Sequence, residues 1–364
     1  MGTIARIIRF FSATALAVAL APQAAFAADY YAGKRITVLI NYAAGGPSDI
    51  EGRLFAKHIG RHIDGQPVVI VQNMDGAGGV IGANYIGEIA PKDGTVLGLL
   101  TASAWQFALD AGKGRVDYKT YEFIATQAST AVYFMRTDVK PSIRQPTDLA
   151  KAEGLVVGGL AADSTKDLLL RLTLDMLGLK YKYVTGYRGS NAARLALQQG
   201  EINIYSETPP SYRALVEPGL VAKGEAIGLF WDPLYDGRTF SKSPQVDGLP
   251  MGSFPDLYKQ IKGVEPSGQL WDVYRTALAL SGELLRIAVM PPGTPKAAVD
   301  AMRAAYGKLA RDKDFADDAI KAFGFVPEYS AGADTNERVR PQLDMSSELK
   351  AFVAQYVNAT GLQK

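Results

Sequence analysis

The sequence of 364 residues contains no cysteine and only two histidines. The lack of cysteine excludes disulfides, thiolate catalysis and thiolate metal ligands, and it also excludes lipid attachment at an N-terminal cysteine. His58 and His62 stand four residues apart on a predicted helix, and this spacing can hold a metal ion. No third ligand stands out beside them, so we predict neither a metal site nor a cofactor.

The chain also lacks a strong charge of either sign, because 39 Lys and Arg residues nearly balance 37 Asp and Glu residues. Such a balance provides no basic surface that would attract nucleic acid or an acidic membrane. The sequence has no G-x-S-x-G turn, no H-E-x-x-H motif and no P-loop. Gly76, Gly78 and Gly82 miss the G-x-G-x-x-G spacing of dinucleotide-binding proteins. We therefore predict that the protein is not an enzyme, with a hydrolase that uses one of the histidines as base as the alternative.

The N-terminus combines a basic start, a short apolar run and a small-residue site. Two arginines precede the apolar residues 10–21, and Ala25-Phe26-Ala27 follows them. This pattern predicts a secretory signal peptide over residues 1–27. The run is shorter than the roughly 20 residues that span a bilayer, and an uncleaved anchor is the alternative. We therefore expect an exported protein whose mature part starts at residue 28.

Strand-like and helix-like segments alternate along the rest of the chain. Residues 35–42, 66–73 and 94–103 are short apolar runs, and helical patterns separate them. The same alternation restarts after residue 120 and continues to about residue 207. Strands that alternate with helices favour parallel sheets with right-handed crossovers. The sequence therefore predicts an α/β protein with two lobes that are joined by crossing strands.

The first predicted strand is followed by a glycine-rich turn that leads into a helix. Ser48 and Glu51 have the spacing of a capping box, which predicts a helix that begins at Ser48. Glycines let backbone N–H groups point outward, and the start of a helix favours an anion. A second turn, at residues 76–79, also follows a strand and opens a helix. We interpret the two turns as one cradle for an anion, with plain strand-to-helix connections as the alternative.

Two further helix starts in the second lobe could contact the other end of a ligand. Ser164 and Asp167 have capping-box spacing at the start of a long amphipathic helix. Tyr187 and Arg188 precede the next helix, and Arg188 could bind a carboxylate through two hydrogen bonds. Plain helix capping and a solvated surface charge are the alternatives for these residues.

Four segments carry a resemblance to a known family, and they occur in the order ITVLINYAAGGPSDIEGRLFAKHI, GQPVVIVQNMDGAGGVIGANYIGEIAPKDGTVL, GYRGSNAARLALQQGEIN and VMPPGTPKAAVDAM. They are similar to the periplasmic substrate-binding proteins of tripartite tricarboxylate transporters, the Bug family. The resemblance implies a two-lobed, type II-like periplasmic binding-protein fold with a hinge and two crossing strands. It implies that residues 28–131 and 233–364 form the first lobe and that residues 132–232 form the second lobe.

The resemblance also implies the function and the site. Proteins of the Bug family bind small carboxylates between the lobes, so we expect a monomeric receptor in the periplasm. It would deliver a mono-, di- or tricarboxylate, aromatic ones included, to permease subunits of the transporter, and a module that serves a sensor kinase is the alternative. Carried over from the family, the expected ligand-binding residues are Ala44, Gly45, Gly46, Pro47, Ser48, Asp49, Gly76, Ala77, Gly78, Gly79, Ser164, Thr165, Tyr187, Arg188 and Gly189.

Overall fold

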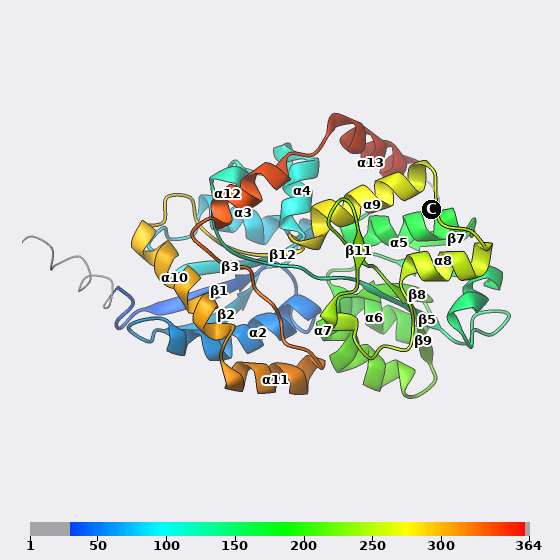
Figure 1. The fold of residues 1–364 in the computed structure, drawn as a ribbon, viewed down its shortest axis with the longest axis horizontal. Helices are drawn as coiled ribbons and strands as arrows, with labels where there is room; N and C mark the ends of the chain where they lie inside the picture. Colours follow the sequence, from blue (N-terminus) through cyan, green and yellow to red (C-terminus); the bar gives the residue numbers. More distant parts are fainter. Residues whose placement is uncertain (1–29, 361–364) are drawn as a thin grey trace, which may run out of the picture.

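The computed structural model of the protein describes residues 30–360, and the predicted signal peptide at residues 1–27 lies outside this range. The chain forms two lobes that lie side by side along the long axis of the molecule (Figure 1). Each lobe is built round a five-stranded sheet. This architecture confirms the predicted α/β fold with two lobes.

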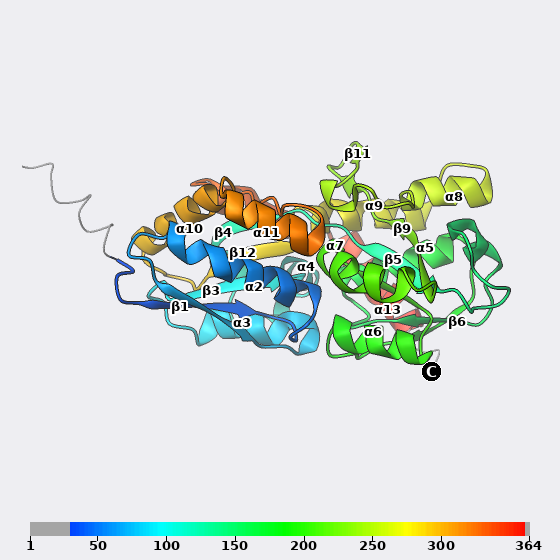
Figure 2. The ribbon, with the colours of Figure 1, turned by 90° about the horizontal axis from the view of Figure 1, so that it is seen from below.

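The first sheet has the strand order β2-β1-β3-β12-β4. Its strands are β1 (Arg35–Ile40), β2 (Val68–Asn73), β3 (Val96–Thr101), β4 (Glu122–Gln127) and β12 (Arg286–Met290). β1 pairs in parallel with β2 and β3, while β12 is antiparallel to β3 and β4. The carboxyl ends of β1, β2 and β3 therefore meet at one edge, and the loops after them face the second lobe (Figure 2).

Both faces of the first sheet are covered, because successive side chains of a strand point to opposite faces. Val38 and Ile40 join the core beneath α2 and α10, whereas Leu39 joins the core on the other face beneath α3. The helices of this lobe are α2 (Pro47–Ile59), α3 (Val80–Glu88), α4 (Ser103–Leu109), α10 (Lys296–Leu309), α11 (Lys313–Phe323) and α12 (Thr335–Val339). Short 3-10 turns are η1 (Gly60–His62), η2 (Ala77–Gly79), η3 (Ala111–Lys113), η4 (Tyr118–Thr120) and η8 (Arg340–Leu343).

The second sheet has the order β7-β6-β8-β5-β9. Its strands are β5 (Val132–Arg136), β6 (Leu155–Gly158), β7 (Tyr181–Val184), β8 (Ile204–Glu207) and β9 (Ala226–Trp231). β6 is parallel to β7 and β8, and β5 runs antiparallel between β8 and β9. Its helices are α5 (Thr165–Met176), α6 (Ser190–Gln199), α7 (Pro209–Ser211), the π-helix η6 (Tyr212–Val221) and the 3-10 helix η5 (Pro146–Lys151).

The chain passes between the two sheets after β4 and leaves the second sheet after β9. Residues 128–131 join β4 to β5, and Asp232 follows β9 directly. The two crossing segments are hydrogen-bonded to each other, because Asp232 N donates to Ala131 O at 3.0 Å. The crossing segments thus lie together at the hinge side of the interface between the lobes.

Helices α8 (Phe254–Lys262), α9 (Gln269–Gly282) and α13 (Ser347–Thr360) pack against the second lobe. Tyr274 and Leu278 of α9 and Leu349 of α13 share one buried core with the leucines of α5. The prediction placed residues 233–364 in the first lobe, and these three helices are where the packing differs from it. Apolar side chains at helical spacing on α9 give it a face that packs mainly on α5 of the second lobe and also meets Trp105 and Ala108 of α4. The short strands β10 (Leu234–Tyr235) and β11 (Phe240–Ser241) and the turn η7 (Pro244–Val246) precede these helices.

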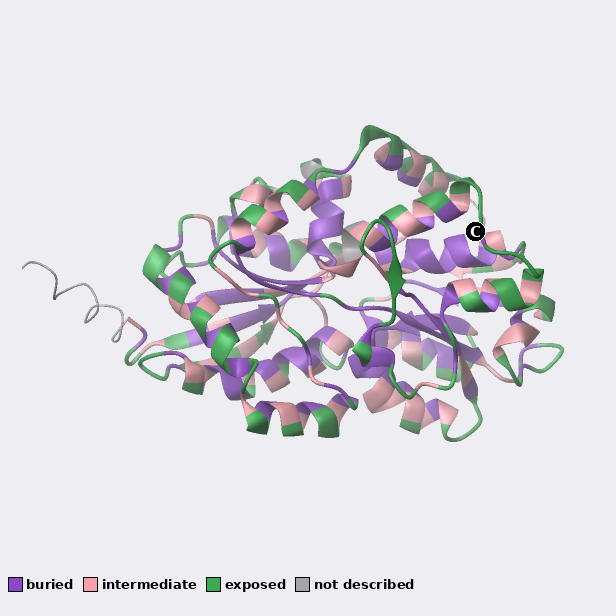
Figure 3. Cartoon of the chain, viewed as in Figure 1, coloured by how far each residue is buried: buried purple, intermediate pink, exposed green. Residues whose placement is uncertain are grey.

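Burial is concentrated in the two sheets and in the helix faces that cover them, while the outer helix faces are exposed (Figure 3). Helix α5 is buried along most of its length between the second sheet and α9. Of the helices in residues 30–360, not one combines the length and the apolar character that crossing a bilayer requires.

Candidate functional site

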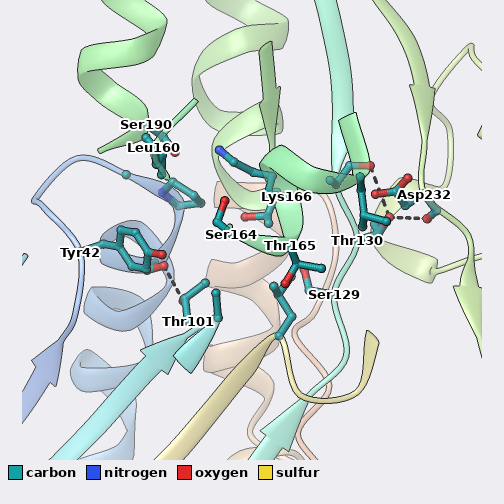
Figure 4. Close-up of a pocket in the computed structure, with 18 of the residues that line it drawn as sticks. Tyr42, Thr101, Ser129, Thr130, Leu160, Ser164, Thr165, Lys166, Ser190 and Asp232 are labelled. Atoms are coloured by element: carbon teal, nitrogen blue, oxygen red, sulfur yellow. Dashed lines mark hydrogen bonds between the residues drawn. The ribbon is translucent and has the colours of Figure 1, made fainter. Parts of the chain in front are cut away.

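Two neighbouring cavities lie between the lobes. The first, here called the hinge cavity, has about 890 Å³ of empty space, including the part open to solvent. Its walls come from both lobes and from both crossing segments (Figure 4). The residues that line it include Tyr42, Ala43, Gly46, Pro47, Ser48, Thr101, Ser129, Thr130, Leu160, Ser164, Thr165, Lys166, Leu169, Ser190, Thr208, Asp232, Leu278 and Leu285.

The second, here called the loop cavity, has about 1060 Å³ of empty space and lies between the second glycine turn and the loop before α6. The residues that line it are Tyr42, Gly76, Ala77, Gly78, Gly79, Val80, Gln106, Lys113, Leu160, Ala161, Asp163, Gly186, Tyr187 and Arg188. Tyr42 and Leu160 belong to both cavities. The Tyr42 hydroxyl donates to Gly78 O at 2.9 Å, and burial raises its pKa, so it stays a donor.

The structure distributes the predicted site residues over these two cavities. Gly46, Pro47, Ser48, Ser164 and Thr165 line the hinge cavity. The turn at residues 76–79 lines the loop cavity together with Tyr187 and Arg188. The two glycine turns, which were expected to form one cradle, thus face adjoining cavities with Tyr42 between them.

Four predicted residues, Ala44, Gly45, Asp49 and Gly189, line neither cavity. Gly189 instead permits a close approach of the lobes, because a Cβ there would lie 3.1 Å from the Ala43 Cβ of the first lobe. The part of the prediction that these four residues contact the ligand therefore has no support in the geometry of the cavities.

The predicted capping box of the first turn is wrong. Helix α2 begins at Pro47 with Gly46 as its N-cap, since proline is preorganised for the first helical position. The Ser48 hydroxyl pairs with the Thr101 hydroxyl at 2.7 Å. The Glu51 carboxylate is taken by the guanidinium of the buried Arg286 instead of turning back to the start of the helix.

Asp49 braces the first turn and does not face the cavity. Its carboxylate accepts hydrogen bonds from Gly45 N and Arg53 Nε, both at 2.9 Å, and from Asn73 Nδ2 at 3.0 Å. Burial raises the pKa of Asp49, but these hydrogen bonds outweigh it and leave the pKa below its ordinary value. The Asp49 carboxylate is therefore already hydrogen-bonded within the first lobe, although it lies beside the proposed anion site.

The second turn depends on left-handed backbone. Gly76, Ala77, Gly78 and Gly79 have φ values of 124°, 49°, 62° and 93°, in a region that glycine tolerates and other residues rarely adopt. A Cβ on Gly79 would also lie 2.3 Å from Asn41 Nδ2. The glycines therefore bring the start of α3 close to the end of β1.

In the second lobe, Ser164 caps helix α5 as predicted and accepts a hydrogen bond from Asp167 N at 3.3 Å. The Asp167 carboxylate does not complete the box, because it accepts from the backbone of Leu160 and Ala161 and from the Tyr183 hydroxyl. The Thr165 hydroxyl is buried in the wall of the hinge cavity and has no hydrogen-bond partner among the described residues. A ligand or water in the cavity would supply that partner.

Sequence reasoning missed the lysine and the aspartate that line the hinge cavity, Lys166 and Asp232. Asp232 is buried and accepts hydrogen bonds from the hydroxyls of Tyr133 and Tyr274, both at 2.6 Å. Burial raises the pKa of Asp232 to about 7, although the two tyrosines oppose the shift. The available signal was the placement of an acid directly before Pro233, at the end of the apolar residues 226–231.

His58 of α2 and His62 of the following turn η1 both contact aspartates at or within α11. His58 Nε2 is 2.8 Å from Asp318 Oδ2, and His62 Nε2 is 2.6 Å from Asp312 Oδ2. His58 is buried at this helix contact. Neither histidine lines the hinge cavity or the loop cavity, and no group of three potential metal ligands occurs within residues 30–360.

Two curated proteins are similar to this chain in sequence. A UPF0065 protein from the TAR-I ttuE-ttuC' intergenic region of Agrobacterium vitis is 31% identical over 201 residues, which cover 53% of this chain and 56% of that protein. A UPF0065 protein from the gbd 5' region of Cupriavidus necator is 29% identical over 216 residues, which cover 57% of this chain and 64% of that protein. The chain thus matches less than two thirds of the length of either relative. No model of a protein family matches the sequence.

Solved structures resemble the chain over nearly their whole length. The periplasmic binding protein BugD has a TM-score of 0.65 at 19% identity and covers 91% of this chain and 99% of its own. Rhodopseudomonas palustris Rpa4515 with adipate has a TM-score of 0.63 at 17% identity and covers 90% and 98%. MatC from the same organism, with bound malate, has a TM-score of 0.58 at 16% identity and covers 90% and 99%. The resemblance predicted from the sequence is thereby confirmed, because the chain shares its fold with Bug and TctC periplasmic binding proteins and is similar in sequence to UPF0065 proteins.

Proposed function

We propose that the protein is a periplasmic solute-binding receptor that captures a small organic carboxylate between its lobes. The observation that supports this most is that three helix starts line one cavity, with Ser48 from α2, Ser164 from α5 and Ser190 from α6. The start of a helix offers free backbone N–H groups and a partial positive charge, which together favour an anion. The unpartnered hydroxyl of Thr165 adds a further hydrogen-bonding group to the same wall.

Structures that share the fold agree with this ligand class. One of them holds malate and another holds adipate, and both compounds are small carboxylates. The proposal extends the ligand class of those proteins to the present chain.

Polar contacts between the lobes support a mechanism in which the ligand is enclosed. Trp105 Nε1 of α4 donates to Asp163 O at 2.8 Å, and Arg286 Nη2 of β12 donates to Thr208 Oγ1 at 2.8 Å. Each bond joins a residue of the first lobe to a residue of the second lobe. We propose that both bonds form when the lobes close over a ligand and break when they open.

The ligand-binding residues that we propose for the hinge cavity are Gly46, Pro47, Ser48, Ser164 and Thr165. The residues at 76–79, with Tyr187 and Arg188, would contact any part of the ligand that reaches the loop cavity. Four or five charge-assisted hydrogen bonds of about 1.5–3 kcal/mol each, reduced by the costs of association, are compatible with roughly micromolar affinity. The chemistry required is binding alone, so the proposal assigns no catalytic residue.

A thermal-shift screen of the chain from residue 28 onward tests the proposal. Mono-, di- and tricarboxylates, aliphatic and aromatic, are each compared with the corresponding carboxamide. At about 100 times its Kd a true ligand stabilises the folded state by about 2.7 kcal/mol, which raises the Tm by several degrees. A library in which no carboxylate raises the Tm more than its carboxamide does would contradict the proposal.

We further propose that the receptor acts as an exported monomer and delivers its ligand to permease subunits of a tripartite tricarboxylate-type transporter. Deletion of its gene should abolish uptake of the carboxylate that the purified protein binds. Normal uptake in the deletion strain, together with loss of a transcriptional response to that carboxylate, would favour the sensor-kinase alternative instead.

A further inference from the structure

Lys166 lines the hinge cavity from the first turn of α5. Its Nζ donates to the Tyr205 hydroxyl at 2.8 Å and to Ser206 O at 3.0 Å, and it lies 4.2 Å from the centroid of the Tyr205 ring. A lysine ammonium has three donors, so the two neutral acceptors leave one N–H for another partner. Figure 4 shows this side chain between Ser164 and Ser190 in the wall of the cavity.

No carboxylate of residues 30–360 lies within the 4.0 Å of Lys166 Nζ that defines an ion pair. The nearby acids are occupied elsewhere. Glu207 pairs with Arg194 at 2.6 Å, and Asp167 accepts from two backbone N–H groups and from Tyr183. Lys166 Nζ therefore makes no direct ion pair with a described residue, and the charges of Asp167 and Glu207 act on it only from a longer distance.

The position of Lys166 is electrostatically unfavourable without an anion. It is the second residue of α5, where the helix dipole is positive and a cation is destabilising. Burial also lowers the pKa of Lys166, which means that its surroundings disfavour the charged form. An anion in the hinge cavity would offset both effects.

Among the described residues that line the hinge cavity, Lys166 is the one basic side chain. Its body is lined by the apolar side chains of Leu160, Leu169, Leu278 and Leu285, and the crossing segments add the acid Asp232. A second carboxylate on a short ligand would therefore meet apolar side chains, neutral hydroxyls such as those of Ser129 and Thr130, or Asp232, and no second cationic side chain among the described residues that line the cavity.

We infer that Lys166 is the counter-ion of the bound carboxylate and that the hinge cavity selects a monocarboxylate with an apolar body. This inference rests on the proposed function, because it assumes that a carboxylate occupies the cavity. It goes beyond that function by naming the charged group that selects the ligand and the number of carboxylates that the site accepts.

Calorimetric titration with hexanoate, adipate and hexanamide tests the inference on wild type, Lys166→Met and Lys166→Gln. These probes share one chain length and differ in the number of carboxylates. The loss of one charge-assisted contact should weaken hexanoate binding by about 10- to 100-fold in both variants. The wild-type preference for hexanoate over hexanamide should largely disappear. Lys57→Met is the matched control, because Lys57 is exposed, pairs with Asp318 and lines neither cavity.

Each outcome decides a separate point. Unchanged hexanoate binding in Lys166→Met would overturn the counter-ion role, and so would equal losses for hexanoate and hexanamide, which indicate a structural effect. Tighter binding of adipate than of hexanoate by wild type would overturn the monocarboxylate selectivity and leave the proposed function intact. If wild type bound no carboxylate in this titration or in the wider thermal-shift screen, both proposals would fail.

Discussion

The hinge cavity and the loop cavity share the residues Tyr42 and Leu160, but the basic side chains that line them differ in their partners. In the loop cavity, Lys113 pairs with Asp163, and Arg188 lies 3.5 Å from Asp75. In the hinge cavity, Lys166 has only neutral hydrogen-bond acceptors. A cation that is already paired gains little from a second anion. An anionic ligand should therefore be stabilised more by Lys166 in the hinge cavity than by the paired cations of the loop cavity.

The two cavities also differ in how their walls are supported. The hinge cavity is bordered by buried polar groups. Glu51 of α2 pairs with Arg286 of β12 behind the cavity residues Ser48 and Thr101, and Asp232 is held by two tyrosine hydroxyls. The loop cavity rests on glycine backbone at residues 76–79 and on partly exposed ion pairs. Substitutions should therefore destabilise the protein far more at the hinge cavity than at the loop cavity.

The largest expected effect is that of Glu51→Gln. It leaves the buried Arg286 guanidinium without its counter-ion, which should lower the free energy of unfolding by about 3–5 kcal/mol. The matched change in the loop cavity, Asp163→Asn, breaks a partly exposed pair and should cost about 0–1 kcal/mol. Urea unfolding of both variants measures the difference. Equal losses of unfolding free energy would contradict the proposal that the hinge cavity depends more on buried ionic groups than the loop cavity does.

The next effect is a pH dependence of stability that originates at Asp232. Its pKa is about 7 in the folded protein and near 3.8 when unfolded, so the folded state binds the proton more tightly. Stability should therefore fall as the pH rises from about 4 to 7, by at most about 4 kcal/mol from this residue.

Asp232→Asn isolates this contribution, because asparagine cannot ionise and keeps an oxygen acceptor for one of the two tyrosine hydroxyls. Burial also raises the pKa of Glu51, Asp167 and Glu207, and these acids act in the same direction in both proteins. The difference in unfolding free energy between wild type and variant should therefore change between pH 4 and pH 7. A constant difference over this range would show that Asp232 does not bind a proton there.

The two glycine turns provide a smaller and more local comparison. Gly46 has φ −88°, and a Cβ there meets no atom closer than 3.6 Å, so Gly46→Val should fold and narrow the hinge cavity. Gly78 has φ 62°, and its Cβ would lie 3.4 Å from Ala161 Cβ. Gly78→Val should therefore cost about 1–2 kcal/mol of stability.

Calorimetry on the two glycine variants then locates the carboxylate. We expect Gly46→Val to weaken binding of a short carboxylate at least about tenfold, which corresponds to about 1.4 kcal/mol. Gly78→Val should weaken it less, because its side chain enters the loop cavity. The reverse order would place the carboxylate in the loop cavity.

The order of strands and helices was readable from the sequence because apolar runs and amphipathic periods are local signals. The packing of α9 on the second lobe was not, because residues 232–270 are rich in Gly, Pro, Ser and Asp and the partner of α9 is about 100 residues distant. Trp271, Tyr274 and Leu278 mark an apolar face, but no local pattern says which lobe covers it.

At the site, sequence reasoning found the helix starts and missed the charges. Ser48 and Glu51 fit a capping box locally, yet Arg286, 235 residues away, takes the Glu51 carboxylate. Lys166 follows a predicted cap, where a lysine ordinarily reads as a solvated surface charge. Only the fold brings Tyr205 and Ser206 to it and places its ammonium in the cavity wall. Long-range contacts therefore decided the residues that sequence reasoning missed.

Arg188→Ala should have the smallest effect and the sharpest ligand dependence. The Arg188 side chain is 85% exposed and lies 3.5 Å from Asp75, so its loss should change the free energy of unfolding by less than about 0.5 kcal/mol. A short monocarboxylate that occupies only the hinge cavity should bind within about twofold of wild type, since about 0.4 kcal/mol separates the two affinities. A longer dicarboxylate that reaches past Tyr42 would lose more, because Arg188 is then within reach of its second carboxylate. Calorimetry with a homologous series of dicarboxylates therefore shows the chain length at which the second carboxylate reaches Arg188. A loss of affinity that is equal at every chain length would show that Arg188 acts only through the charge of the protein surface.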